Sequence, residues 1–477
     1  MQAESSHKSF PSSTQTFRNR TIPELSPNAN SKEVPAPCML SVMAIAQNRP
    51  TPIATAICFV LAWLVLGLPI ARIADRDFEV DEAEYLTIAV HSMRQAMGET
   101  DASVGGQLVL PTNPDPWKDG IHDSTFGFQS PGLPKLLFGI TGVAAGVGEV
   151  DALVFPRFAE PGLSRGAAKE RRLAAREAVK PALSPGRALT RVLASIIAAL
   201  LFAIASSVAS SWAKPSHRHV AGVLAAALWL ASPVAWEASA YVRPGLLPIV
   251  FWCAALLLTL TVERTIFLSI GLGICCGLAT AGKLNGILIA PLVPYFLFNV
   301  LRGRGIDRRQ AFRITAGASA LAGALAFAIF LLFSPGLWHD TLSGVSQTLR
   351  MWTGDLAHQA SIAPDTATIA SGPMHSLQLG FSGLVSFASA VPYAGAVLLP
   401  LGLAALARGS KQGQQPHVDR VVLAWSALLL LASALLIPMD RARYILPMIA
   451  PAALVQALLI ARVMALYGEL RTAKIHD

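Results

Sequence analysis

The chain has 477 residues, of which 53% are hydrophobic and only 14% are charged, and its formal net charge is +9. Because charged residues make up about 25% of an average soluble domain, this composition excludes an ordinary soluble protein. The basic residues lie in short segments beside apolar runs, where the positive-inside bias and anionic lipids account for them, so the net charge does not indicate a nucleic-acid partner.

The first segment, residues 1–50, is rich in Ser, Pro, Asn and Thr and has no apolar periodicity. Such a composition cannot bury a core and predicts a disordered N-terminal tail. The apolar run at residues 53–73 comes next. This run is long enough to cross a bilayer and lies too far from Met1 for a cleaved leader, so it predicts a signal anchor. The sequence leaves open whether Met1 or Met43 is the start.

Apolar runs separated by short polar breaks continue along the chain. They predict transmembrane helices, because barrel strands would be about 10 residues long with strict alternation. The predicted fold is all-α and polytopic, with about 10–11 transmembrane helices in a membrane domain at residues 51–470 and a short tail at residues 471–477. A shorter run, residues 133–147, could cross the membrane or lie on its surface. The other predicted spans are residues 189–212, 220–236, 246–262, 267–281, 284–301, 314–333, 384–407, 421–437 and 444–466.

Positive charge in the short loops gives an orientation. Placing the basic loops in the cytoplasm puts residues 74–187 and 334–383 on the outer face as two long loops. The basic stretch at residues 157–191 then lies outside, against the rule, although long loops count less. Within it, residues 165–180 predict an amphipathic helix on the outer membrane surface. The predicted location is the plasma (inner) membrane, with the functional face outside.

An acidic motif follows the first predicted helix, where residues 75–85 read Asp-Arg-Asp-Phe-Glu-Val-Asp-Glu-Ala-Glu-Tyr. An acidic side chain costs roughly 2.5–3.5 kcal/mol at the centre of a membrane helix, so this cluster belongs at the membrane interface. There it faces water on one side and lipid-borne molecules on the other. Neighbouring carboxylates repel one another, which favours the protonated form of some of them and suits a general base.

Four further motifs follow in chain order. Residues 130–137 read Ser-Pro-Gly-Leu-Pro-Lys-Leu-Leu, and an Ala-Ser-Pro turn at residues 231–233 precedes Ala-Tyr-Val-Arg-Pro at residues 240–244. Residues 277–286 read Gly-Leu-Ala-Thr-Ala-Gly-Lys-Leu-Asn-Gly, and residues 441–447 read Arg-Ala-Arg-Tyr-Ile-Leu-Pro. Each motif is weak alone. In this order, together with the acidic motif, they resemble the C-type (GT-C) membrane glycosyltransferases, most closely the dolichyl-phosphate-mannose protein mannosyltransferase group and its bacterial relatives.

The resemblance is incomplete. The family's His is Ser130 here, its second Pro is Gly132, and its Gly is Pro134. The Asp that comes soon after the family's outer-face Arg is absent after Arg243, and residues 334–383 show no pattern of a folded soluble domain. These departures leave the acceptor open.

What the resemblance implies is an inverting transfer of a hexose, mannose-like, from a polyprenyl- or dolichyl-phosphate carrier. The acceptor could be a protein, a lipid or an envelope glycan on the outer face. Such a reaction needs a carboxylate base for the acceptor's proton and cations for the charge that builds on the leaving phosphate. By the motif match, Asp81 is the candidate base and Glu82 the second candidate.

Cations in the other motifs are candidates for contact with that phosphate. Arg suits bidentate phosphate binding, and Lys acts as a point charge. Each also fits a structural role, as a snorkelling side chain or a buried ion pair. No metal-ligand spacing is present, so no cofactor is predicted, with a divalent cation left open. The candidate substrate- and phosphate-binding residues are Tyr85, Lys135, Arg243, Lys283, Arg441 and Arg443.

Two other classes of function remain. A polytopic secondary transporter or lipid flippase would bind its substrate near the midplane, often between inverted repeats, and the sequence shows no internal repeat. A non-catalytic scaffold would keep the fold without needing Asp81. The predicted partners are a lipid-linked sugar donor, an acceptor and the lipid bilayer.

Overall fold

The computed structural model describes residues 52–73, 82–97, 132–148, 165–212, 215–334, 370–387, 394–412, 415–437 and 442–476, with residues 346 and 368 between them. The chain divides into two units, residues 1–47 and 48–477, and all described residues belong to the second unit. Within the described ranges every regular element is a helix, which confirms the predicted all-α class. The predicted tail at residues 1–50 lies outside the described residues.

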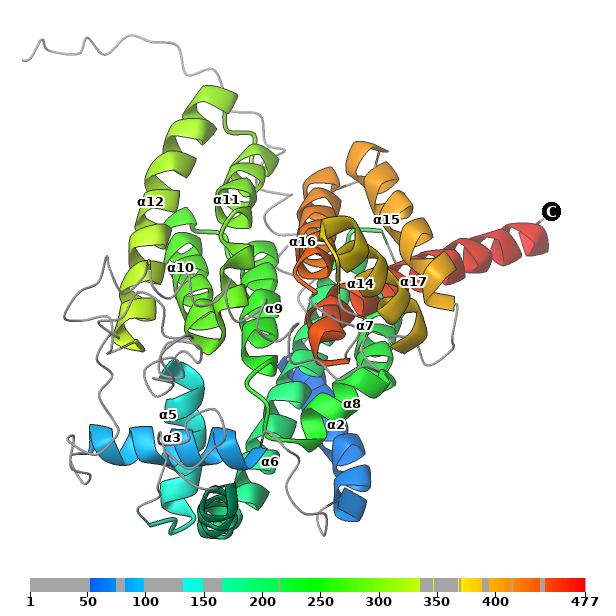
Figure 1. Ribbon diagram of the computed structural model, residues 1–477. Coiled ribbons are helices and arrows are strands. Elements are labelled where there is room, and N and C mark those ends of the chain that lie inside the picture. The colour runs from blue at the N-terminus through cyan, green and yellow to red at the C-terminus, as the bar shows by residue number, and fades with distance from the viewer. Residues whose placement is uncertain are drawn as a thin grey trace, which may run out of the picture. The chain divides into compact units, whose positions relative to one another are not determined.

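Many of the helices lie side by side as a bundle (Figure 1). In chain order they are α2 (Pro52–Ile73), α3 (Glu82–Ala96), α5 (Gly132–Ala144), α6 (Arg165–Ala209), α7 (Pro215–Leu230), α8 (Pro233–Ala240), α9 (Leu246–Thr261), α10 (Thr265–Gly282), the 3-10 helix η3 (Leu284–Ile289), α11 (Leu292–Gly303), α12 (Arg308–Leu332), α14 (Pro373–Phe387), α15 (Ala394–Gln412), α16 (Pro416–Leu435) and α17 (Ala442–His476).

Six helical segments in the described ranges are long and apolar enough to cross a membrane, or seven if α7 and α8 form one bent span. The chain is therefore a multi-pass integral membrane protein. Shorter apolar helices occur at Pro52–Gly67, Gly132–Ala144 and Leu246–Thr261, and the larger predicted number of spans stays a prediction. The six segments are Leu173–Ala209, Thr265–Gly282, Leu284–Gly303, Arg308–Leu332, Pro416–Leu435 and Tyr444–Gly468.

The predicted span at residues 220–236 is wrong in one respect, because it crosses a break between two helices. The chain bends by 65° between α7 and α8. Ser232 caps α8, its hydroxyl accepting the Ala235 N–H at 3.4 Å, and Pro233 is the first residue of the helix. A capping Ser followed by Pro starts a helix and does not continue one, and a hydropathy plot does not register that signal.

Helix α6 also differs from its prediction. It runs without interruption for 45 residues, from the predicted surface helix into the predicted span at residues 189–212. Pro181 and Pro185 lie inside it. Proline removes a backbone hydrogen bond, but membrane helices tolerate it where neighbouring groups satisfy the freed carbonyls. The two prolines therefore do not separate a surface helix from a spanning one.

Helices α3 and α5 pack together with the first half of α6 at one end of the bundle, where α3 crosses α5 (Figure 1). Their shared core includes Leu86, Phe138 and Val179, each at most 2% exposed. Helix α5 has 13 residues, about 20 Å at 1.5 Å per residue, against about 30 Å of hydrocarbon. This length favours the surface alternative for the ambiguous run at residues 133–147.

The main core lies among α6, α7, α9, α10, α16 and α17, and small residues let the helices approach closely. Gly273 and Gly277 lie one turn apart on the face of α10 that contacts α12. A Cβ atom on either would lie 2.7 Å from a carbonyl oxygen of α12, that of Ala322 or Ala326 respectively. This is the small-residue spacing that membrane helices use for close packing, and it gives a structural reason for Gly277, the first residue of the fourth motif.

Candidate functional site

Glu82, the first residue of α3, forms a buried ion pair with Arg187 of α6. The Arg187 Nε and Nη2 atoms donate to the two carboxylate oxygens at 3.0 and 2.6 Å, and the side chains are only 1% and 4% exposed. The Val242 backbone N–H donates to Glu82 Oε1 at 2.8 Å. Three donors therefore hold one carboxylate, a bidentate geometry that fixes both partners. The contact joins three segments that are far apart in the sequence.

Two arginines flank the ring of Tyr241, which follows α8 in an extended conformation. The Cζ atoms of Arg187 and Arg243 each lie 5.7 Å from the ring centroid, within the range of a cation–π interaction. Arg243 also pairs with Glu237 at 3.1 Å, and the Glu237 side chain is 42% exposed. We call Glu82, Arg187, Tyr241, Val242 and Arg243 the Glu82 cluster.

The Ser-Pro turn positions this cluster. Because the turn begins α8 at Pro233 and the helix ends at Ala240, the next residues are delivered to the start of α3. Gly186 of α6 makes room for them, since a Cβ atom there would lie 3.0 Å from Val242 Cγ2. The residues of the third motif therefore serve helix capping and close packing, in addition to any chemical role of Arg243.

The other motifs reach the same end of the bundle. A Cβ atom on Gly282, next to Lys283, would lie 2.9 Å from Leu247 Cβ at the start of α9, and one on Gly245 would lie 3.5 Å from Leu446 Cδ2 near the start of α17. The N-terminus of α5 meets the end of α12, where Gly132 faces the Phe333 carbonyl. The structure thus gathers the beginnings of α3, α5, α9 and α17 and the end of α10.

The two candidate lysines differ in environment. Lys135 lies in the first turn of α5 and is 9% exposed. Burial lowers the pKa of Lys135 to about 8, because removal from water disfavours the charged form. Lys283 directly follows α10 and is exposed. The charge of Lys135 therefore changes near pH 8.

The remaining predicted residues are placed only in part. Asp81 and Arg441 lie outside the described residues, and Arg443 belongs to α17 with a side chain that is not described. Tyr85 lies in α3 and packs, half-buried, against the small core of α3, α5 and α6. The roles of these residues stay predictions.

Sequence reasoning missed Arg187, Tyr241 and Glu237. Arg187 belongs to the stretch interpreted as a basic outer loop, and its partner Glu82 is 105 residues away. One local signal was available, since Arg187 stands two residues before an apolar run that predicts a membrane span. An ionisable residue at that position needs a partner.

A metal centre finds no support in the part of the chain that the structure describes, where no group of three or more His, Cys, Asp or Glu could hold an ion. The four described cysteines are free, and three of them are buried. The predicted lack of a metal site stays a prediction for the whole chain.

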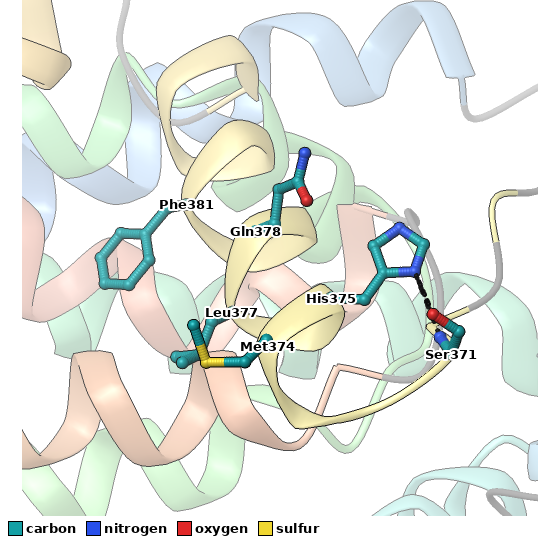
Figure 2. Close-up of a pocket in the computed structure, with 6 residues that line it drawn as sticks. All are labelled: Ser371, Met374, His375, Leu377, Gln378 and Phe381. Carbon is teal, nitrogen blue, oxygen red and sulfur yellow. Dashed lines mark hydrogen bonds between the residues drawn. The ribbon is translucent and has the colours of Figure 1, made fainter.

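A separate pocket of about 690 Å³ lies along the start of α14 (Figure 2). His375 Nδ1 accepts the Ser371 backbone N–H at 3.1 Å, so in the neutral ring the other nitrogen carries the proton. Gln378 and Phe381 follow on the same helix and complete the polar and aromatic lining. The described lining contains no Lys, Arg, Asp or Glu, so it suits a neutral molecule better than a phosphate.

Comparisons with known proteins found similar solved structures. No family model matches it, and no curated protein does. It is similar to the structure of ArnT from Cupriavidus metallidurans bound to undecaprenyl phosphate, with a TM-score of 0.48 and 14% identity over 92% of this chain and 64% of that one. It is also similar to the apo oligosaccharyltransferase of Archaeoglobus fulgidus, with a TM-score of 0.49 and 14% identity over 89% of this chain and 52% of that one. The chain thus spans less than two thirds of the length of either structure.

Proposed function

We propose that the chain is a GT-C-type membrane glycosyltransferase that transfers a sugar from a polyprenyl-phosphate carrier to an acceptor at the outer face of the membrane. The observation that carries this proposal is the Glu82 cluster. It holds Arg243 beside the start of α3, which is also the end of the acidic motif. Lys135 lies at the start of α5 and Lys283 directly follows α10, and these helix ends reach the same part of the bundle.

The arrangement supports a division of roles between two neighbouring carboxylates. Glu82 already accepts three hydrogen bonds and is buried, so it suits a positioning role better than that of a base. Asp81 precedes it directly, and a trans peptide keeps their Cα atoms about 3.8 Å apart. We therefore assign the general base to Asp81 and the placement of that base to the Glu82–Arg187 pair.

In the proposed reaction, Asp81 takes the proton of an acceptor hydroxyl, and the acceptor oxygen attacks the anomeric carbon. The bond from that carbon to the carrier phosphate breaks, and the phosphate leaves with the electron pair, so the configuration inverts. Arg243, Lys135 and Lys283 are proposed to stabilise the charge that develops on the phosphate. Arg441 and Arg443 keep the same proposed role, and the motif resemblance favours a mannose-like hexose.

Sugar transfer in vesicles tests the proposal. Radiolabelled polyprenyl-phosphate hexose is supplied to the wild type and to Asp81→Asn, which keeps the shape and removes the base. Loss of a general base should reduce transfer by about 10²- to 10⁴-fold. Glu177→Gln is the matched control, because that carboxylate is 71% exposed and pairs only with the exposed Lys180 among the described residues. Equal transfer by wild type and Asp81→Asn would remove Asp81 from the mechanism.

A second arm addresses the alternative of a transporter or lipid flippase, which one observation favours. The bent pair of α7 and α8 has the length and composition of a broken span or a re-entrant loop, and transporters use broken helices to build substrate sites. The same vesicles are therefore tested for movement of a fluorescent polyprenyl phosphate between leaflets. Movement without transfer, with several sugars tried, would replace the proposed transferase by a flippase.

A further inference from the structure

A second arginine of α6 lies one turn beyond the Glu82 cluster and has a different environment. The Cζ atom of Arg191 lies 4.1 Å from the ring centroid of Trp63 on α2. A Cβ atom on Gly67 would lie 2.8 Å from Arg191 Nη1, so the glycine makes room for the guanidinium. The contact places a cation between α2 and α6, at a position inside the candidate span Leu173–Ala209.

Arg191 has no anionic partner among the residues that the structure describes. Its Nε atom is buried without a hydrogen-bond partner, and none of the described carboxylates pairs with its guanidinium. A cation–π contact compensates only in part for the water that this partly buried cation loses. An ionisable side chain within a membrane span points to a functional contact, and here the missing group is an anion.

An apolar groove continues from this cation along the same two helices. Its volume is about 540 Å³, and its lining includes Phe59, Ala56 and Pro52 of α2 and Ala199 and Ala203 of α6, with the end of α9. On α2, Trp63, Phe59, Ala56 and Pro52 follow at intervals of three or four residues, which places them on one face of the helix. The part of α6 that lines the groove begins two turns beyond Arg191. The cation and the groove therefore lie along the same contact between α2 and α6, which we call the seam.

The surroundings of the seam face the bilayer. Ile53, Ile57 and Leu61 of α2 are between 53% and 72% exposed, as expected for a helix surface in contact with lipid. Arg191 lies two residues after the start of the apolar run at residues 189–212, and Trp63 contacts it there. Tryptophan is enriched at this depth, at the boundary between acyl chains and headgroups. The guanidinium can therefore reach the headgroup region while the groove lies at the depth of the chains.

We propose that the seam between α2 and α6 is a binding site for an anionic phospholipid of the bilayer. Its phosphate pairs with Arg191 above Trp63, and one acyl chain lies in the groove. The single positive charge matches the single negative charge of a phosphodiester. From Phe59 to Pro52 the groove is about 10 Å long at 1.5 Å per residue, which fits part of one acyl chain. This site is independent of the proposed sugar transfer.

Lipid binding to the full chain tests this site directly. Protein purified in mild detergent is stripped of lipid and titrated with fluorescent phosphatidylglycerol or phosphatidylcholine. The wild type should retain phosphatidylglycerol at least tenfold better than Arg191→Gln, with no such difference for phosphatidylcholine. Arg408→Gln is the matched control, because it removes the same charge from an exposed position on α15. Equal retention of phosphatidylglycerol by wild type and Arg191→Gln would overturn the proposal.

Two further measurements cover the other outcomes. If Arg191→Gln does not fold, Ala199→Phe fills the groove while keeping the cation, and it should reduce phosphatidylglycerol retention and the associated rise in melting temperature. Unchanged retention in that variant would overturn the acyl-chain part of the proposal. Competition with polyprenyl phosphate identifies the occupant. Displacement of phosphatidylglycerol by an equal concentration of the carrier would assign the site to the carrier and overturn the phospholipid assignment.

Discussion

Two buried carboxylate–arginine pairs occur in the part of the chain that the structure describes, and only one of them shares an aromatic ring with a second arginine. Glu82 pairs with Arg187 near the start of α17, whereas Asp419 of α16 pairs with Arg462 of α17. Leu446 and Arg462 are 16 residues apart on α17, about 24 Å at 1.5 Å per residue. The two pairs therefore hold different levels of the same bundle.

The Asp419–Arg462 pair satisfies its own polar groups. Arg462 Nη2 donates to both carboxylate oxygens of Asp419 at 2.9 Å, and Nη1 donates to the Ala405 carbonyl at 2.9 Å. The Arg462 Cζ atom lies 5.2 Å from the ring centroid of Trp212. Helices α15, α16 and α17 and the end of α6 are joined there, with no further cation among these contacts. We call a pair that satisfies its own polar groups in this way a closed pair, and it indicates a structural contact.

The Glu82–Arg187 pair has similar bidentate geometry but lies next to Arg243 and one turn from Arg191. Burial and geometry alone therefore do not distinguish a structural ion pair from one that supports chemistry, because a buried pair is often no more stable than apolar residues of the same volume. The distinguishing feature is a second arginine, Arg243, at the Tyr241 ring that Arg187 contacts. Cations placed together in this way are what an anionic substrate would require.

Arg187→Met should have the largest effect. It leaves the Glu82 carboxylate buried without its cation, which costs about 3–5 kcal/mol in the free energy of unfolding, and it should also abolish sugar transfer. The melting temperature in detergent and transfer per folded molecule are measured. The double variant Glu82→Leu/Arg187→Met should regain most of the stability but not the transfer. Recovery of transfer in the double variant would make this pair structural, like the other one.

Asp419→Ala should lower stability by up to a similar amount, about 3–5 kcal/mol, because it leaves the largely buried Arg462 without its carboxylate. Transfer per folded molecule should stay within about twofold of the wild type, since the contacts of this pair are internal to the helix bundle. The measurement compares melting temperature with specific activity corrected for the folded fraction. A loss of specific activity as large as that of Arg187→Met would end the distinction between the two pairs.

Gly409→Ala tests the packing of the Asp419–Arg462 pair by adding a methyl group beside it. A Cβ atom there would overlap Asp419 Oδ2 and lie 3.0 Å from both terminal nitrogens of Arg462, so overpacking should cost about 1–3 kcal/mol. Gly245→Ala is the control near the Glu82 cluster, because its Cβ atom would make only an ordinary contact of 3.5 Å with Leu446. Equal melting temperatures for Gly409→Ala and the wild type would contradict the tight packing of this pair.

The smallest expected effect concerns pH and Lys135. Burial lowers the pKa of Lys135 to about 8, so its charge is present below that pH and is lost above it. If the charge binds the donor phosphate, kcat/KM for the donor should fall about tenfold between pH 7 and pH 9, because this ratio reports ionisation of the free enzyme. Lys135→Arg stays charged throughout and should remove this part of the pH dependence. An unchanged profile in that variant would exclude Lys135 from donor binding.

Hydropathy predicted the regular parts of the fold well. The predicted spans at residues 246–262 and 267–281 correspond to α9 (Leu246–Thr261) and α10 (Thr265–Gly282), because each is a single apolar run with a short connection. Hydropathy did not predict the helix boundaries that depend on local stereochemistry and not on apolar content. The cap at Ser232 divides one apolar run into two helices, and Pro185 fails to divide another.

The candidate site was predicted only as a set of motifs. Their order along the chain favoured a shared function, and the structure brings the ends of several of their helices together. The partner of Glu82 could not be predicted, because Arg187 is 105 residues away and local periodicity carries no information on such contacts. The charge of Arg187 was visible in the sequence, but its surroundings resembled those of the nearby loop arginines.

The three-way contact of Glu82 also constrains how the chain is assembled. The Val242 N–H that completes it is made 160 residues after Glu82, about 8–32 s later at a synthesis rate of roughly 5–20 residues per second. Until Arg187, made 105 residues after Glu82, is in place, an unpaired carboxylate would be costly in hydrocarbon. Helix α3 must therefore stay at the water surface until α6 and the segment after α8 have been inserted.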